Sequence, residues 1–192
     1  MSQPSDAPAI DPRAYRATIG LFATGVAVVA AGYGNHLHAM TANAVTSLSL
    51  DPPLLIFCVG KNARMVSAME QSAGFSVNIL RDGQQALSTY FAGGWKEPNA
   101  PPFRFVPWEG GPRLEGCAAS IACALHERIE GGDHWIVVGR VVAVYQGAEP
   151  RRPLLFYGGR YRHLDAESAP APDLEQEPPP IQIFYDPWQV DQ

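Results

Sequence analysis

Short apolar runs, separated by glycine, proline and polar residues, make up most of the chain. Residues 25–31 (GVAVVAA) and 54–60 (LLIFCVG) are short and rich in apolar and β-branched side chains, which is typical of buried strands. Residues 75–80 alternate like a strand that buries one face. Two longer strand patterns follow at roughly 116–130 and 133–146. These runs predict a mainly β protein.

Two more places in the chain are expected to form strands. Residues 38–50 carry small and hydroxylated side chains in a strand-like context, and Asp51 with the two prolines after it breaks this segment. Near the C-terminal end, residues 153–157 and 160–164 form a pair that two glycines separate. The chain therefore has at least six predicted strands.

The first predicted helix lies near the N-terminus. Asp11, which a proline follows, fits an N-cap with proline at the first helical position. Tyr15, Ile19 and Phe22 then recur at helical spacing, so a short amphipathic helix is predicted to reach about residue 23.

Two further short helices are predicted in the middle of the chain. Asn62 is expected to cap a helix in which Met65 and Met69 share one face. Asp82 is expected to cap another, which ends at Gly93. Because the strands do not alternate regularly with long helices, the pattern favours an antiparallel barrel with helical decoration over a doubly wound parallel sheet.

Composition and charge narrow the class of protein. With 192 residues, 46% of them hydrophobic and 17% charged, the chain suits one globular domain. A net charge of -5 makes general attraction to nucleic acid or anionic lipid unexpected. The longest apolar runs are too short to cross a membrane, and residues 1–12 lack the features of a secretory signal. A cytoplasmic location is therefore predicted.

The composition along the chain predicts three parts. Residues 1–10 are expected to be a flexible tail, and residues 11–165 to form the folded domain. Residues 166–192 are expected to be an acidic, proline-rich linker followed by an aromatic C-terminal tail. The three cysteines lie in apolar, strand-like contexts, which predicts buried free thiols and neither a disulfide framework nor a metal site.

The stretch GGDH is the first candidate for a functional group. If the glycines at 131–132 form a two-residue hairpin turn, Glu130 and Asp133 flank the turn and His134 lies across from Ile129. His134 would then be held by a rigid element and remain reachable by a ligand. The alternative is that these are ordinary solvated turn residues.

A second candidate site lies in residues 40–53, MTANAVTSLSLDPP. Small side chains there would let a flat ligand lie close to backbone N–H groups. The residues KNAR at 61–64 open a predicted helix, and Lys61 and Arg64 near its N-terminus would suit a phosphate. A polar strand edge followed by an ordinary helix cap is the alternative.

Four segments together resemble one family. They are ATGVAVVAA at 23–31, MTANAVTSLSLDPPLLIFCV at 40–59, LSTYFAG at 87–93 and GDHWIVVGRV at 132–141. In this order and spacing they resemble the short-chain flavin reductases, FMN-binding split β-barrel proteins that are often the reductase component of two-component flavin-dependent monooxygenases. The resemblance runs from about residue 13 to about residue 164.

The resemblance implies a homodimer of antiparallel, Greek-key split barrels with about six strands each and a few short helices. It also implies FMN or FAD as the flavin and NADH or NADPH as the hydride donor. His134 matches the family's GDH histidine, which is associated with nicotinamide binding and hydride transfer. The cofactor-binding residues that the resemblance implies, besides His134, are Thr41, Ala42, Asn43, Ala44, Val45, Thr46, Ser47, Lys61, Asn62, Arg64, Phe91, Ala92, Tyr157 and Arg160.

The predicted function is NAD(P)H-dependent reduction of FMN or FAD for a separate monooxygenase. Hydride transfer between two stacked rings needs positioning, and it requires no metal. The alternative is a non-catalytic FMN-binding protein that acts as an electron carrier or redox sensor. A split-barrel oxidase acting on an organic substrate is a third option, but the sequence offers it no dedicated acid–base residues.

Overall fold

The computed structural model describes residues 10–32, 34–72, 74–148 and 152–164. The helices are α1 (Pro12–Ile19), α2 (Arg64–Ser72) and α3 (Gln85–Phe91), with the 3-10 turns η1 (Gly34–His36) and η2 (Asp82–Gln84). The strands are β1 (Thr24–Gly25), β2 (Ala27–Ala31), β3 (His38–Ala42), β4 (Val45–Leu50), β5 (Pro53–Gly60), β6 (Gly74–Ile79), β7 (Phe105–Val106), β8 (Arg113–Leu114), β9 (Ala119–Gly131), β10 (His134–Gln146), β11 (Leu155–Tyr157) and β12 (Arg160–Arg162).

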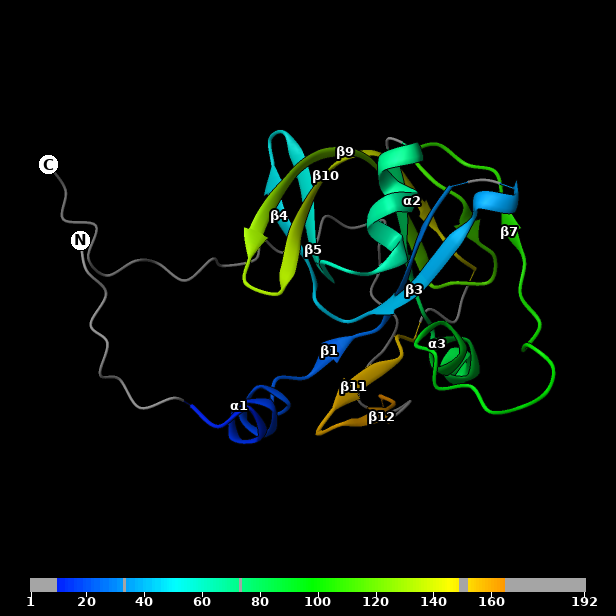
Figure 1. Ribbon diagram of the computed structural model, residues 1–192. Coiled ribbons are helices and arrows are strands. Elements are labelled where there is room, and N and C mark those ends of the chain that lie inside the picture. The colour runs from blue at the N-terminus through cyan, green and yellow to red at the C-terminus, as the bar shows by residue number, and fades with distance from the viewer. Residues whose placement is uncertain (1–9, 33, 73, 149–151, 165–192) are drawn as a thin grey trace, which may run out of the picture.

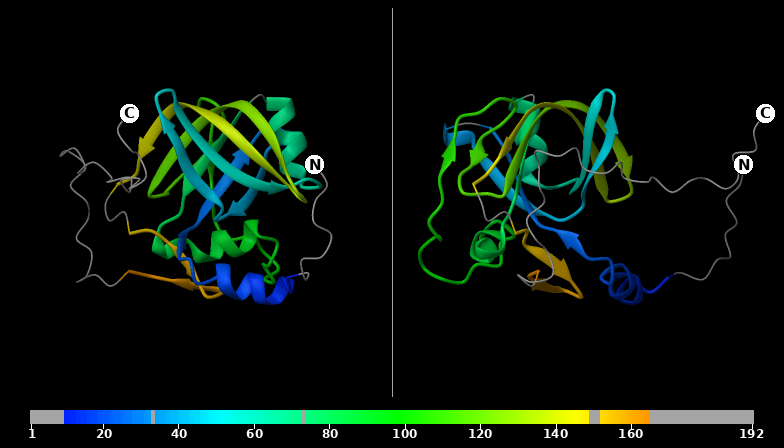
Figure 2. Two further views of the ribbon diagram at one scale, coloured as in Figure 1. Left: turned by 90° about the vertical axis from the view of Figure 1, so that its left-hand side faces the viewer. Right: turned by 180° about the vertical axis from the view of Figure 1, so that it is seen from behind.

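Seven of these strands form one antiparallel sheet in the order β3-β2-β6-β9-β10-β5-β4. This sheet curls into the barrel in the upper part of Figure 1, with α2 packed against it. Strands β1, β11 and β12 form a smaller sheet, which lies with α1 and α3 below the barrel (Figures 1 and 2). The prediction of a mainly antiparallel β fold with a few short helices is confirmed.

The barrel has one more strand in its sheet than the six expected, because residues 38–50 form two strands. β3 pairs with β2 and β4 pairs with β5, and only Asn43 and Ala44 lie between them. The chain thus crosses from one edge of the sheet to the other over two residues. That crossing places a short stretch of unpaired backbone at the opening between the two edge strands.

The core follows from the apolar runs in the sequence. All five residues of β2 are buried, as expected for a strand covered on both faces. The side chains of Phe57 and Phe75 meet edge to face inside the barrel, with their ring centroids 5.0 Å apart. Met65 and Met69 of α2 are fully buried in the same cluster, so the predicted shared face of this helix is confirmed.

The helix boundaries differ from the prediction. Asp11 caps α1 by accepting a hydrogen bond from the Arg13 N–H at 2.9 Å, but the helix ends at Ile19 and buries none of its residues. Asn62 does not cap α2, which begins at Arg64, two residues later. Asp82 does not act as an N-cap either, because it lies inside η2.

The β9–β10 hairpin turns one residue later than predicted. His134 pairs with Gly131, not with Ile129, and Trp135 pairs with Glu130. The two turn residues are therefore Gly132 and Asp133, and Gly132 alone of the two glycines has a positive φ, 67°. Pairing of β10 with β5 fixes this register, because it sets His134 opposite Gly60.

Several predictions concern residues outside those described. The proline-rich linker and aromatic tail at 166–192 belong to this group, as do residues 1–9 of the expected N-terminal tail. Within the described part of the chain, no helix is long and apolar enough to cross a membrane. The cysteines are free, and Cys117 and Cys123 are buried while Cys58 is half-buried.

Candidate functional site

A cleft of about 970 Å³ opens between the barrel and the smaller sheet below it. Its volume lies within the range of about 300–1,000 Å³ that is usual for sites of small ligands and cofactors. The lining comes from Arg16, Ile19, Gly20 and residues 22–27 around α1 and β1, from residues 42–46 between β3 and β4, from Ile56, Cys58, Val77, Ile79 and Ile121 of the barrel, and from Phe156 and Gly159 of the β11–β12 hairpin.

The crossing between β3 and β4 forms the central wall of this cleft. Asn43 and Ala44 lie outside the paired registers of both strands, so the strand ladders leave their N–H groups unused. The Ala44 carbonyl accepts a hydrogen bond from the Cys58 N–H at 3.0 Å, which ties the crossing to β5. Asn43 Nδ2 donates to Thr24 Oγ1 at 3.2 Å, which ties it to β1. The crossing is thus held from both sides.

The residues of this wall fit a flat aromatic ring system such as a flavin. Gly25, Ala42 and Ala44 present almost no side chain, so a ring can approach the backbone closely. Backbone N–H groups outside the strand ladder can donate to ring carbonyls and nitrogens. The apolar side chains of the barrel strands offer the rest of the surface. The cleft therefore has the size, the lining and the free donors that a flavin requires.

Five of the predicted binding residues, Ala42 to Thr46, line the cleft together. Their two neighbours in the predicted set do not. The Thr41 hydroxyl donates to the Ser88 carbonyl at 2.6 Å and so fastens β3 to α3. Ser47 is exposed on β4. The centre of the predicted binding segment thus lines the cleft, and its two ends do not.

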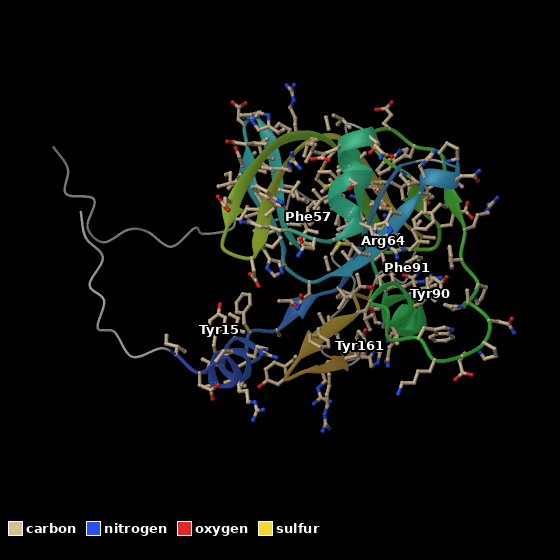
Figure 3. The ribbon with its side chains drawn as sticks, viewed as in Figure 1. Tyr15, Phe57, Arg64, Tyr90, Phe91 and Tyr161 are labelled. Carbon is tan, nitrogen blue, oxygen red and sulfur yellow. The ribbon has the colours of Figure 1, made fainter. Side chains whose placement is uncertain are left out.

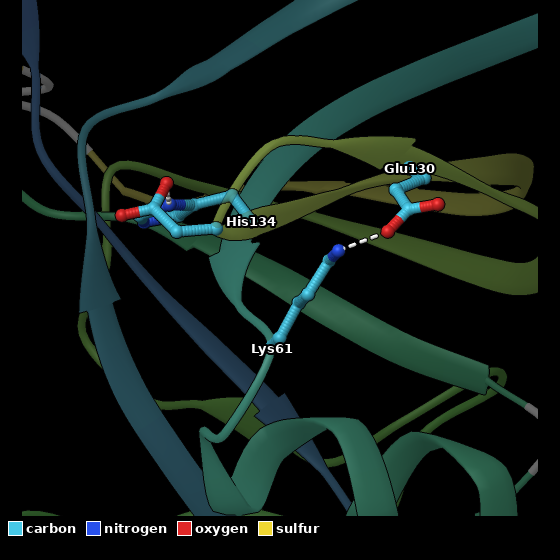
Figure 4. Close-up of polar contacts among 4 residues, drawn as sticks. Lys61, Glu130 and His134 are labelled. Atoms are coloured by element: carbon cyan, nitrogen blue, oxygen red, sulfur yellow. Dashed lines mark hydrogen bonds and ion pairs between the residues drawn. The ribbon is translucent and has the colours of Figure 1, made fainter.

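His134 stands at the tip of the β9–β10 hairpin, and half of its side-chain surface is exposed. Its Nδ1 lies 2.7 Å from Asp133 Oδ1, and this contact fixes the ring (Figure 4). The hydrogen bond from His134, followed by its charge, lowers the pKa of the Asp133 carboxyl. With Nδ1 engaged, Nε2 is the nitrogen left for a ligand.

Lys61 also belongs to the tip of this hairpin. Its N–H donates to the Asp133 carbonyl at 3.1 Å, and its ammonium forms an ion pair with Glu130 (Figure 4). This ammonium also lies 5.3 Å from the centre of the Trp135 ring. The hydrogen bond from Lys61 lowers the pKa of Glu130. Lys61 therefore braces the tip and does not line the cleft.

The other predicted phosphate ligands also lie outside the cleft lining. Asn62 and Arg64 are exposed. Arg64 stands near His38, whose pKa is lowered first by burial and then by the Arg64 charge. The helix start at residues 61–64 and the crossing between β3 and β4 are thus separate features of the chain.

Phe91 and Ala92 lie at the C-terminal end of α3. The Phe91 ring packs against Phe103 and Phe105, with ring centroids 5.0 Å and 5.9 Å apart, and also contacts Tyr90. Ala92 is the C-cap of the helix. Figure 3 shows Phe91 and Tyr90 together, apart from Tyr15 on α1. Phe91 thus belongs to an aromatic cluster with Tyr90, Phe103 and Phe105.

Tyr157 and Arg160 close the β11–β12 hairpin as paired residues. Both are exposed, and neither belongs to the cleft lining. Their neighbours Phe156 and Gly159 do line it. The predicted hairpin thus reaches the cleft through Phe156 and Gly159, while the binding roles of Tyr157 and Arg160 stay predictions.

The N-terminal wall of the cleft was not anticipated from the sequence. Residues 16–27 contribute Arg16, Gly20, Thr24 and several small or apolar side chains. The run of small residues in GLFATG, directly after a short helix, was the available signal for a close backbone approach. Among the described residues, no group of three or more His, Cys, Asp or Glu is placed to hold a metal ion.

This fold and this cleft define a flavin reductase-like protein. The family model described as "Flavin reductase like domain" matches residues 19–165. The chain therefore belongs to the flavin reductase-like family, and the resemblance noted in its sequence is confirmed.

Named relatives make the comparison more specific. The chain is 37% identical over 175 residues to the NADH-dependent FAD reductase of Streptomyces globisporus, covering 87% of this chain and 92% of that protein. It is 41% identical over 151 residues to the reductase component of 4-hydroxyphenylacetate 3-monooxygenase of Thermus thermophilus, covering 79% and 95%. The solved structure of the S. globisporus NADH:FAD oxidoreductase SgcE6 in complex with NAD and FAD fragments superposes with a TM-score of 0.73 at 36% identity, covering 85% of this chain and 100% of that one.

Proposed function

We propose that this protein is an NAD(P)H:flavin oxidoreductase that reduces FMN or FAD and supplies the reduced flavin to a separate flavin-dependent monooxygenase. The observation that carries this proposal is the cleft wall at Asn43 and Ala44, where unpaired backbone N–H groups meet small side chains. Residues at this wall would hold the flavin, which when bound would supply a ring that can accept a hydride from a nicotinamide. The names of the relatives support the same activity.

The protein's part in this reaction is to position the two rings. The crossing between β3 and β4 is held by hydrogen bonds to β5 and β1, so its N–H groups are preorganised for a ligand. Donors fixed in this way stabilise the negative charge that a flavin ring gains on reduction, without reorganising during the reaction. Gly25 has no side chain and Ala44 only a methyl group, which leaves room for two stacked rings.

His134 is proposed to contact the nicotinamide. The hairpin tip that carries it lies on the same side of the molecule as α1, which borders the cleft (Figures 1 and 2). Asp133 holds Nδ1, so Nε2 can bind the carboxamide of the nicotinamide, and the protonated ring would add a positive charge.

The test is anaerobic mixing of the protein with excess FMN or FAD and then with NADH or NADPH, followed by the bleaching of the flavin absorbance. We expect many turnovers per protein molecule, and we expect His134→Ala to slow turnover about tenfold or more. His126→Ala is the matched control, since His126 is an exposed histidine of β9. Stoichiometric flavin binding without turnover would contradict the enzyme and favour the carrier or sensor.

We also propose a homodimer. Leu50, at the end of the edge strand β4, is 89% exposed, and Val144 of β10 is 70% exposed. Apolar side chains at this exposure on one sheet favour burial against a second copy. Analytical ultracentrifugation should show a dimer that Leu50→Asp or Val144→Asp dissociates. Leu21→Asp, at a residue 65% exposed beyond α1, should leave the dimer intact.

The separate monooxygenase is proposed from the relatives, several of which are named as reductase components or subunits. The cytoplasmic location and the division of the chain at residues 10 and 165 stay predictions. Limited proteolysis tests the division, because a domain spanning 11–165 should survive as one protected fragment.

A further inference from the structure

The cleft contains one charged side chain among its described lining residues, and it is Arg16. This arginine lies in the last turn of α1. Everything else on that wall is small, apolar or uncharged, including Ile19 and Phe22. The chain as a whole carries a net charge of -5, so a cleft whose one charged lining residue is a cation differs from the average of the molecule.

Within the part of the chain that the structure describes, no carboxylate neutralises the positive charge of Arg16. Its Nε donates to the Pro12 carbonyl at 3.3 Å, which leaves the two terminal nitrogens of the guanidinium available. The salt bridges among the described residues give Arg16 no partner. Asp11 is the nearest acid in the sequence, and its side chain is engaged with the Arg13 N–H.

The β11–β12 hairpin is fastened next to Arg16 and also carries positive charge. The Gly158 N–H donates to the Gly20 carbonyl at 2.8 Å, so the β11–β12 hairpin is fastened to the end of α1. That hairpin carries Arg160 and Arg162, both exposed. Arg160 and Arg162 do not line the cleft, but their charges lie on an element fastened next to Arg16, so they add to the positive potential that an anionic ligand group would meet at this end.

Apolar surface accompanies the charge. Phe22 is 70% exposed and Ile19 is 52% exposed, and both line the cleft beside Arg16. An exposed aromatic ring next to an unpaired guanidinium suits a nucleotide, because the ring can cover a sugar or base while the guanidinium binds the phosphate. Neither residue fills the core, since Ile19 belongs to a helix that buries none of its side chains and Phe22, beyond that helix, is largely exposed.

We propose that Arg16 binds a phosphate of the nucleotide held in the cleft, with Phe22 against the adjoining sugar or base. This inference rests on the proposed function and adds a specificity residue to it. The phosphate can belong to the ribityl chain that FMN and FAD share, to the adenosine side of FAD, or to the adenosine side of NADH. The chemistry is the same in each case: a guanidinium fork on phosphate oxygens.

The experiment compares Arg16→Gln with Arg13→Gln, an equal loss of charge on the same exposed helix at a residue that does not line the cleft. Dissociation constants for riboflavin, FMN and FAD are measured by fluorescence titration without nicotinamide. Michaelis constants are then measured for NADH and for reduced nicotinamide mononucleotide, which lacks the adenosine side. We expect Arg16→Gln to weaken at least one phosphate-bearing ligand about fivefold and to leave riboflavin unchanged.

The pattern identifies the phosphate. Weaker FMN and FAD assign the ribityl phosphate, and weaker FAD alone assigns its adenosine side. A raised Michaelis constant for NADH but not for reduced nicotinamide mononucleotide assigns the adenosine side of NADH. Arg16→Lys should restore part of the affinity, and higher salt should shrink the difference between wild type and Arg16→Gln. Unchanged constants for all ligands, an equal loss of riboflavin, or an equal effect of Arg13→Gln would overturn the proposal.

This outcome is separable from failure of the proposed function. The flavin titrations need no turnover, so a carrier that binds FMN without reducing it would still report on Arg16. Conversely, a working reductase whose constants ignore Arg16→Gln would overturn only the phosphate site.

Discussion

Two hairpins carry a Gly-Gly pair, one lining the cleft and the other bearing His134, and they differ in both register and anchoring. In the β11–β12 hairpin, Gly158 and Gly159 are the turn, with φ of 59° and 73°. In the β9–β10 hairpin, the turn is shifted to Gly132 and Asp133, and Gly131 is the last residue of its strand. A Gly-Gly pair therefore marks a hairpin without fixing which residues turn.

Their anchoring differs more than their turns. The β11–β12 hairpin is joined to α1 by a backbone hydrogen bond from Gly158 and to α3 by the Tyr161 hydroxyl, 2.9 Å from that of the buried Ser88. The tip of β9–β10 is braced by exposed charged pairs, Lys61 with Glu130 and Asp133 with His134. Exposed pairs contribute little to stability, so we expect the two hairpins to respond very differently to substitution.

The largest difference is expected between Gly159→Ala and Gly131→Ala. Gly159 has a positive φ, which costs an L-residue about 1–2 kcal/mol, although an added Cβ would meet no atom within 4 Å. Gly131 has ordinary strand backbone, and its added Cβ would make normal contact with Ile136 at 3.4 Å.

Urea denaturation should therefore show a loss of about 1–2 kcal/mol for Gly159→Ala and no loss for Gly131→Ala. The FMN dissociation constant should rise for Gly159→Ala alone, since Gly159 lines the cleft. Equal losses in both variants would mean that the turn of β9–β10 lies at 131–132 after all.

A smaller effect is expected from Tyr161→Phe. The change removes the hydrogen bond to Ser88, whose side chain is fully buried, and should lower the free energy of unfolding by about 1 kcal/mol. Tyr157→Phe is the control, because Tyr157 is 40% exposed in the same hairpin. Chemical denaturation measures both, and an equal response of the two variants would show that the Ser88 contact does not anchor the hairpin.

The sequence anticipated the strands better than the site. Apolar runs such as 54–60 can be recognised in the sequence because a buried strand requires apolar side chains. The run at 54–60 therefore predicts the strand that carries Phe57 into the core. The centre of the cleft at 42–46 was also predictable, because small polar residues are unusual in a strand. The place of Arg16 in the cleft lining was not predictable, because the residues around it in the sequence do not show that α1 faces a cleft.

The turn of the β9–β10 hairpin was mispredicted for a related reason. Local preference favours glycine at both turn positions, and GGDH offers two registers that differ by one residue. The choice is made by β5, which pairs with β10 from a distant part of the sequence and sets His134 opposite Gly60. A tertiary contact thus decides where the candidate catalytic residue stands.

The smallest effect is expected from Glu130→Gln at the tip of β9–β10. The hydrogen bond from Lys61, and then its charge, lowers the pKa of Glu130 below its ordinary value of 4.5. A carboxyl whose pKa is lowered by folding stabilises the folded state at any pH above its ordinary pKa. This contribution is lost as the pH falls through the pKa of the carboxyl in the folded state. Glu130→Gln should therefore lower the thermal midpoint slightly at neutral pH, and less in about 1 M salt.

The wild-type and variant midpoints should converge in strong acid, because both side chains are then neutral. A difference that persists in strong acid would show that Glu130 acts through packing, and the contrast between the two hairpins would no longer be one of charge against buried hydrogen bonds.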